Sequence, residues 1–154
     1  MVLFKNRYMV IEVAINVIKD SSGNEPIIVT EYNLLKAIKD SILFDFGECG
    51  LALSLGSLQV KYVNPSTKLC IVRTSREDHQ KIWSAMTMVT SIAKCPVTIT
   101  LLHLSGTIKA CKNAALKCEE AKFEQYKLEA GPRLTPEKSL EIRSFIEKIN
   151  ALEN

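Results

Sequence analysis

An α+β sandwich built on one four-stranded antiparallel sheet is the fold that this sequence predicts. The 154 residues are 47% hydrophobic and 24% charged, as in a globular domain that buries a sizeable core. Four stretches carry strand-like apolar patterns, and apolar residues recur at helical spacing in two segments between them. The resulting βαββαβ order is followed by two more helical segments. Antiparallel pairing and right-handed crossovers convert this order into a ferredoxin-like sandwich with extra C-terminal helices.

The first strand and the first helix follow from two different periods. Residues 7–18 alternate, with Met9 on one face and Tyr8 on the other, and a turn cluster occupies 21–26. Thr30 is placed to cap a helix, and Gly47 fits the position just beyond its end. One apolar stripe marks the buried side of this helix: Leu34, Leu35, Ile38, Ile42 and Phe46.

A hairpin is expected next. From Leu51 the apolar period returns to two, so we expect a strand to start there. The alternation shifts by one at Gly56 and Ser57, which predicts a bulge or bend. Residues 64–67 form a short connection. The strand over residues 68–74 then returns along its partner.

The second helix is expected to open at Ser75, with Asp78 three residues on as a variant of the capping box. Apolar residues at helical spacing along it are expected to face the core, and Trp83 is expected at the edge of the core. A fourth strand covers 96–104, and a small-residue turn starts a third helix that runs to about Leu128. Five residues form the expected stripe of the second helix: Ile82, Ala85, Met86, Val89 and Ile92.

The C-terminal part predicts a linker and a fourth helix. Residues 129–135 read as the linker, Thr135 as the cap and Pro136 as the first helical residue. We therefore divide the chain into an RNA-recognition-like α/β domain, 1–128, and a linker with C-terminal helix, 129–154. The expected stripe of this helix is Ile142, Phe145, Ile146 and Ile149.

One sheet face packs the two helices in this layout, and the other is open. An RNA-recognition motif stacks bases on aromatic residues of its open face, but residues 68–74 contain none and Tyr8 lies at the end of its strand. The open face is too apolar to be left wet, so the C-terminal helices or a partner protein should cover it. We expect four side chains there: Val10, Ala14, Cys70 and Val72.

Charge is unevenly distributed along a chain whose net charge is only +3. Residues 21–56 are acidic, whereas 57–81 and 106–127 are basic, so one face can be basic without the whole protein being so. The five cysteines form no CxxC pair and fit apolar patterns, which indicates free thiols in a reducing compartment. Charges interrupt the apolar N-terminus, so we expect no signal peptide and no membrane contact.

Catalytic and metal-binding groups are not indicated. His79 and His103 are the only histidines, and neither has a neighbouring nucleophile or acid–base pair at a useful spacing. We expect both to be structural. A small-molecule enzyme or regulatory domain on this fold therefore finds no support in the pattern.

Several basic positions are candidates for phosphate contacts, each with a plainer alternative. Arg73 ends a strand and Arg76 lies just beyond it, where they either bind phosphate or are solvated corner charges. The turn at 105–107 opens a helix and is an ordinary junction or an anion site. The remaining candidates lie near the chain start, beside Tyr62 and after that turn: Lys5, Arg7, Tyr8, Lys61, Thr107, Lys109 and Lys112.

Three stretches together resemble one family. They are VLFKNRYMVIEV, VKYVNPSTKLCIVRTSREDHQKIWSAMT and LHLSGTIKACKNAALKCEEAKFEQYK. The match spans roughly residues 1–127 and is similar to the small "processing of precursors five" protein subunit of eukaryotic ribonuclease P and ribonuclease MRP. The third stretch looks most like plant members. The segment from Gly131 shows no such match.

The resemblance implies a non-catalytic role. The family binds the catalytic RNA, which removes the 5′ leader from precursor tRNA or, in ribonuclease MRP, processes precursor rRNA. It implies a nuclear and nucleolar location, a barrel-shaped partner among other protein subunits, and no cofactor beyond the Mg²⁺ that the RNA uses. Arg7, Arg73, Arg76 and Lys109 become the best RNA-contact candidates. The alternative is a ferredoxin-like protein-interaction module without RNA binding.

Overall fold

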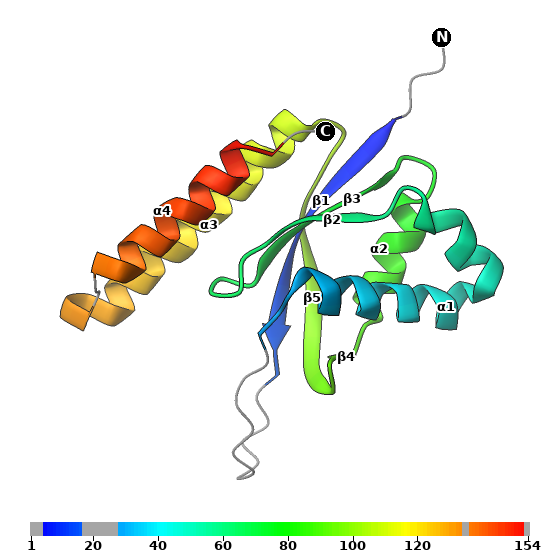
Figure 1. The fold of residues 1–154 in the computed structure, drawn as a ribbon, viewed down its shortest axis with the longest axis horizontal. Coiled ribbons are helices and arrows are strands. Elements are labelled where there is room, and N and C mark those ends of the chain that lie inside the picture. Colours follow the sequence, from blue (N-terminus) through cyan, green and yellow to red (C-terminus); the bar gives the residue numbers. More distant parts are fainter. Residues whose placement is uncertain (1–4, 17–27, 134–135, 153–154) are drawn as a thin grey trace.

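One five-stranded antiparallel sheet separates two layers of helices (Figure 1). The computed structural model describes residues 5–16, 28–133 and 136–152. The strand order is β2-β3-β1-β5-β4. Along the chain the elements are β1 (Asn6–Ile15), α1 (Glu31–Leu55), β2 (Gln59–Val63), β3 (Leu69–Ser75), α2 (His79–Thr87), β4 (Ser91–Ile92), β5 (Cys95–Ser105), α3 (Ile108–Ala130), a 3₁₀ turn (Gly131–Arg133) and α4 (Pro136–Asn150).

The α+β class is confirmed, but the four-stranded sheet is corrected to five strands. The extra strand, β4, has two residues and pairs with Cys95 and Pro96 at the start of β5. The chain reverses through Ala93 and Lys94, whose φ angles of 49° and 69° are left-handed. Two consecutive residues of positive φ make the tight hairpin that brings β4 alongside β5.

Each face of the sheet carries its own apolar core. Helices α1 and α2 cover one face, where Met9, Ile11 and Val13 of β1 pack as the alternation predicts. Helices α3 and α4 lie side by side over the other face (Figure 1), where Cys111, Ala115 and Ile149 are buried. The expected cover of the apolar sheet face is therefore supplied by the C-terminal helices.

The expected membership of that second face is partly wrong. Val10 lies there, but Cys70 and Val72 point into the α1–α2 core, and Leu69 and Ile71 take their places. The continuous apolar run of β3 carries no alternation, so its sequence alone leaves the two faces interchangeable. Register with β1, in which Val10 pairs with Ile71, decides which residues face α3.

The bulge or bend expected at Gly56 and Ser57 is a turn at the end of α1, and β2 carries a separate bulge further along. Val60 pairs with Val72 and Tyr62 pairs with the adjacent Ile71, which leaves Lys61 as the extra residue. An inserted residue reverses the faces beyond it. Val60 consequently packs under α1 and α2, whereas Tyr62 packs under α3.

The strand predicted from Leu51 is wrong. Gly47 does break the first helix, with φ 73° and ψ −177°, but a second helical piece continues to Leu55. Its apparent alternation does not report burial, because Leu53 is 74% exposed and Ser54 is fully buried. A short apolar run is ambiguous between helix and strand.

Helix α2 begins at His79 with Asp78 at the N-cap position, three residues later than the expected cap at Ser75. Ser75 and Asp78 do interact, since the Ser75 hydroxyl lies 2.9 Å from Oδ2 of Asp78, but they stabilise a turn before the helix. Trp83 is 41% exposed rather than at the core edge, which is a further correction. Val89 and Ile92 are buried beyond the helix end.

The remaining predictions are confirmed for β5, α3 and the α4 stripe, whose most buried residue is Ile149. Residues 17 and 18, the turn cluster at 21–26 and the Thr135 cap lie outside the described residues.

Candidate nucleic-acid interface

The sheet register gathers basic residues from three distant segments at one end of the sheet. Arg7 of β1 pairs with Thr74 at the end of β3, and Tyr8 pairs with both Arg73 and Ser105, the last residue of β5. The start of β1, the end of β3 and the start of α3 therefore meet at the upper end in Figure 1. We call this group the basic end: Lys5, Arg7, Arg73, Arg76 and Lys109.

A hollow of about 640 Å³ opens at the basic end. Lys5, Arg73 and Arg76 line it, together with residues from the α1–β2 connection. The backbone N–H of Arg76 donates to the Lys5 carbonyl over 2.9 Å, which ties the turn after β3 to the residue before β1. Three cations from two segments, the residue before β1 and the end of β3 with its following turn, thus border one concave surface.

These cations form no ion pair with an acidic residue in the described part of the chain. The ion pairs found there join Lys81 to Asp78, Lys122 to Glu12, and Lys138 to Glu141. Two carboxylates also border the hollow, but Asp78 is already 3.5 Å from the Lys81 ammonium, and Glu77 is in none of these pairs. Direct pairing therefore leaves the three cations of the hollow without a counter-charge.

Arg73 carries an unusual donor. Its Nε is buried and has no hydrogen-bond partner within the described part of the chain. A buried donor without a partner costs about 1–3 kcal/mol. A guanidinium also suits phosphate because it donates through two parallel N–H groups.

Gly106 makes room for Arg7. A Cβ built on Gly106 would lie 3.3 Å from Nη1 of Arg7, so any larger residue would require the guanidinium to shift by a few tenths of an ångström. Arg7 also donates to the Asn6 carbonyl over 3.0 Å. Sequence reasoning missed this contact because it depends on pairing residues about a hundred positions apart; the glycine at the end of a strand was the available signal.

Helix α3 starts beside Arg7. The Thr107 hydroxyl accepts from the backbone N–H of Ala110 over 3.2 Å, so Thr107 is the N-cap of α3. Lys109 is exposed in the first turn. The start of a helix carries partial positive charge, which adds to that of the basic end.

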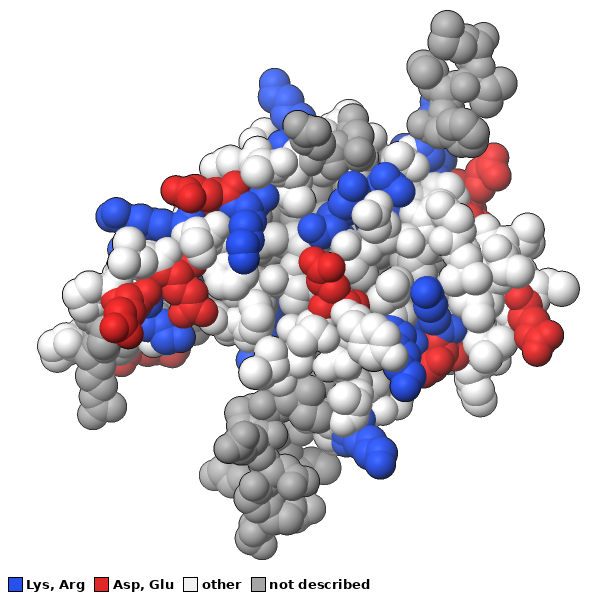
Figure 2. All heavy atoms as spheres, viewed as in Figure 1, with Lys and Arg blue, Asp and Glu red and all other residues white. Residues whose placement is uncertain are grey.

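Three predicted contact residues lie elsewhere or have other partners. Tyr8 is 2% exposed and packs beneath α3, so its ring offers RNA almost no surface. Lys112 donates to the Asn150 carbonyl over 3.1 Å at the end of α4. Lys61 is the bulge residue of the edge strand β2, further along the sheet than the basic end. Figure 2 shows Lys and Arg side chains over β2 and β3 on this view of the surface.

The opposite end of the β2–β3 hairpin binds a buried carboxylate instead. Glu119 of α3 is 1% exposed and accepts from the Thr67 hydroxyl over 2.8 Å. The Tyr62 hydroxyl and the Asn64 amide donate to it over 3.3 Å. We call these four residues the Glu119 clasp, because they bind the hairpin to α3.

Burial sets the protonation of the clasp. It raises the pKa of Glu119 above the ordinary value of 4.5, against the effect of its hydrogen bonds and of Lys122. Burial and the charge of Glu119 also raise the pKa of Tyr62 well above 10.0, so the phenol remains a donor. Burial raises the pKa of the nearby Cys70 thiol to about 12, which agrees with its use as a small apolar residue.

Neither histidine joins a catalytic arrangement in the part of the chain that is described. Nδ1 of His79 contacts the Arg76 carbonyl, and His103 lies within β5. The described residues contain no group of three His, Cys, Asp or Glu side chains that would hold a metal ion. Within 5–16, 28–133 and 136–152, no helix is both long and apolar enough to cross a membrane.

Comparison with known proteins identifies the family. The profile of the Rpp14/Pop5 family matches residues 7–116, which include most of the basic end. The chain belongs to the Rpp14/Pop5 family. The resemblance drawn from the three sequence stretches is therefore confirmed.

Curated relatives agree with this family assignment. The chain is 56% identical to "Probable ribonuclease P/MRP protein subunit POP5" of Arabidopsis thaliana over 155 aligned positions, which cover 100% of both chains. It is 31% identical to "Ribonuclease P/MRP protein subunit POP5" of Schizosaccharomyces pombe, over 83% of this chain and 95% of that protein. The similarity to the first supports a plant member of the family.

A solved structure shares the fold. One chain of "Cryo-EM structure of yeast Ribonuclease MRP" aligns with a TM-score of 0.50 over 82% of this chain and 95% of that chain. Its sequence identity is 12%, so this likeness concerns the fold alone.

Proposed function

We propose that this chain is the Pop5-type protein subunit of the ribonuclease P and MRP ribonucleoproteins, and that its basic end binds and supports their catalytic RNA. The observation that carries the proposal is the convergence of Lys5, Arg73 and Arg76 on one hollow, where no described acidic residue pairs with them. The protein contributes binding and shape, and the RNA performs the cleavage of precursor tRNA and precursor rRNA.

The binding is expected to be directed at the RNA backbone. Helices α3 and α4 cover the sheet face on which an RNA-recognition motif would stack bases, and Tyr8 is buried under them. Contacts from guanidinium and ammonium groups to phosphate position a protein without reading sequence. Affinity should therefore depend on RNA shape and fall steeply with salt.

The assembly and its location follow from this role. The proposed partners are the catalytic RNA, precursor tRNA, a barrel-shaped subunit and other proteins of the holoenzyme, in the nucleus and nucleolus. The chain has no cofactor of its own in this proposal, and Mg²⁺ is held by the RNA. The strand order β2-β3-β1-β5 supports a ferredoxin-like, RNA-recognition-like classification of the domain.

RNA recovery with the tagged full chain tests the proposal. The wild type should retain ribonuclease P and MRP RNA, and a variant with Arg73→Ala and Arg76→Ala should lose affinity for that RNA. The slope of log affinity against log salt should decrease by about 0.7–0.9 for each phosphate contact removed.

A control pair distinguishes this loss from a general effect of charge. Lys36→Ala with Lys39→Ala removes two basic residues of α1 that lie outside the hollow. The RNA role of the basic end is refuted if both double variants bind RNA with the same affinity and salt slope. Unchanged protein partners together with absent RNA would instead support a protein-interaction module.

A further inference from the structure

A second surface has the opposite character to the basic end. A groove of about 410 Å³ lies between α1 and the segment that joins α2 to β4. Phe44 of α1 borders it and is 89% exposed, and Met88 borders it from the other side and is 61% exposed. Exposed large apolar side chains that share one groove are typical of a protein-binding surface.

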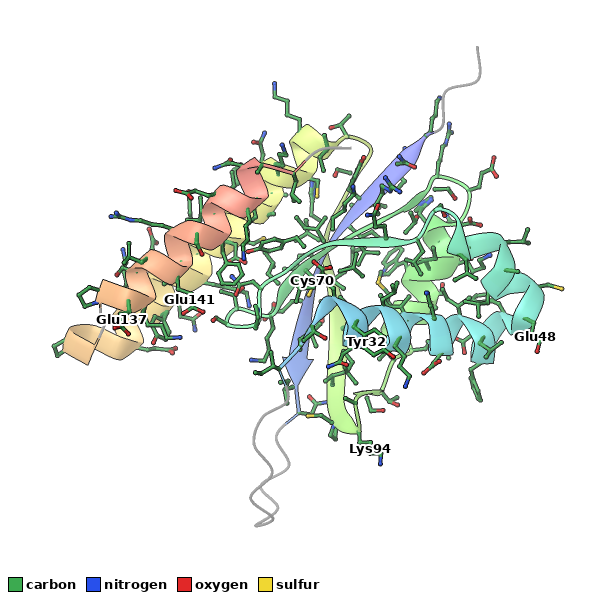
Figure 3. All side chains as sticks on the ribbon, viewed as in Figure 1. Tyr32, Glu48, Cys70, Lys94, Glu137 and Glu141 are labelled. Carbon is green, nitrogen blue, oxygen red and sulfur yellow. The ribbon has the colours of Figure 1, made fainter. Side chains whose placement is uncertain are left out.

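The groove is acidic. Among the described residues that line it, Asp40 and Asp45 are the only charged ones, and none is a lysine or arginine. Asp45 lies within the groove and is 3.4 Å from the Ser41 hydroxyl. Figure 3 shows Lys94 at the β4–β5 turn, on the side away from α1. Two carboxylates beside apolar surface disfavour a nucleic acid and favour a cationic ligand.

The groove and the basic end are well separated. Residues 90 and 91, which line the groove, lie beside the start of β5, because Ser91 pairs with Pro96. The basic end lies beside the last residue of β5, Ser105. An 11-residue strand lies between them, so one molecule can engage RNA and a protein at the same time.

We propose that this groove docks a segment of another protein that presents apolar side chains next to lysine or arginine. Phe44 and Met88 would contact the apolar side chains, and Asp40 and Asp45 the cations. An aromatic residue and a methionine are favoured anchors at such interfaces because they bury a large area with few fixed polar requirements. The inference rests on the proposed function only in that the chain works within an assembly.

Photo-cross-linking tests the docking. The full chain carries p-benzoylphenylalanine in place of Phe44 and is irradiated in cells, and the adduct is analysed by mass spectrometry after RNase treatment. We expect an RNase-resistant adduct to a protein segment with apolar residues and lysine or arginine. Asp40→Lys with Asp45→Lys should reduce its yield about tenfold or more, because like charges would then meet.

A matched position provides the control. Leu128 of α3 is 85% exposed, and the photo-reactive residue placed there should give no adduct to the same segment. An adduct from position 44 to RNA, to a second copy of this chain or to an acidic segment would overturn the proposal, as would no adduct. Loss or retention of RNA in the Arg73→Ala, Arg76→Ala variant tests the basic end alone. The cross-linking result at position 44 does not depend on it.

Discussion

The two ends of the β2–β3 hairpin, the Glu119 clasp and the basic end, differ in whether their charged groups have partners within the protein. At the Glu119 clasp a buried carboxylate accepts hydrogen bonds from three side chains, and nearby Lys122 binds Glu12 at 2.6 Å. At the basic end, the described residues supply no ion-pair partner for Lys5, Arg73 or Arg76, and Nε of Arg73 is buried without an acceptor. The charged groups at the Glu119 clasp have partners within the protein, whereas the cations at the basic end have no ion-pair partner among the described residues.

Because of this difference, we expect the Glu119 clasp to contribute to the stability of the fold and the basic end to contribute to RNA binding. A satisfied buried carboxylate stabilises the fold only while its donors remain in place, and removing it leaves those donors without an acceptor. Cations without partners contribute little to folding and are available to an external polyanion. Substitutions at the clasp should therefore change stability, and those at the basic end should change RNA affinity.

The largest expected effect comes from Glu119→Ala. The change leaves the hydroxyls of Tyr62 and Thr67 and the Asn64 amide without their acceptor, so the free energy of unfolding should fall by about 3 kcal/mol. Urea unfolding followed by circular dichroism measures it. Glu120→Ala, at the adjacent exposed position, should change it by less than about 0.5 kcal/mol. Equal losses in both variants would show that the clasp does not stabilise the fold.

The next effect is a dependence on pH. Because burial raises the pKa of Glu119 above 4.5, the folded protein binds a proton more tightly than the unfolded chain. This contribution to stability is complete below pH 4.5 and is lost as pH rises through the folded-state pKa. Each tenfold difference in proton affinity between the folded and unfolded states corresponds to about 1.4 kcal/mol.

Glu119→Gln isolates that contribution, since glutamine does not titrate. The free energy of unfolding of wild type minus that of Glu119→Gln should decrease as pH rises from about 4 to about 8. Urea titrations of the two proteins across this range provide the comparison. A difference that stays constant or increases with pH would contradict the raised pKa.

A smaller effect is expected at the basic end from Gly106→Ala. The added Cβ would lie 3.3 Å from Nη1 of Arg7 and move the guanidinium, with little change in stability because that atom ends a flexible side chain. RNA affinity should decrease about threefold, less than about 1 kcal/mol, as measured by filter binding. If affinity is retained while stability falls, Arg7 serves the fold rather than the RNA.

The smallest effect separates Lys112 from the other candidates. Its ammonium donates to the Asn150 carbonyl at the end of α4, so Lys112→Ala should lower the free energy of unfolding by about 0.5 kcal/mol. The salt slope of RNA binding should remain as in the wild type. A slope reduced by about 0.7–0.9 would place Lys112 at a phosphate after all.

Sequence patterns predicted the structure correctly where the spacing of apolar residues and the residue types at the ends of an element indicated the same structure. The alternation of β1, the Thr30 cap of α1 and the α4 stripe each follow from local rules, and the structure confirms them. The prediction of a strand from Leu51 was wrong because a short apolar run fits a strand and a helix equally well, and residues 51–55 are helical. The candidate residues Arg73 and Arg76 were found from sequence, but their convergence with Lys5 was not.

By itself, the sequence determined the family, the α+β class and the basic segments, because motifs, periodicity and charge are local properties of the chain. Only the tertiary structure decided which faces β3 presents, that α3 and α4 cover the second one, and that Lys61 forms the bulge. It also decided that Arg7 lies against Gly106 and that Glu119 closes the hairpin. The physical reason is that these contacts join distant segments and depend on strand register, which no local pattern encodes.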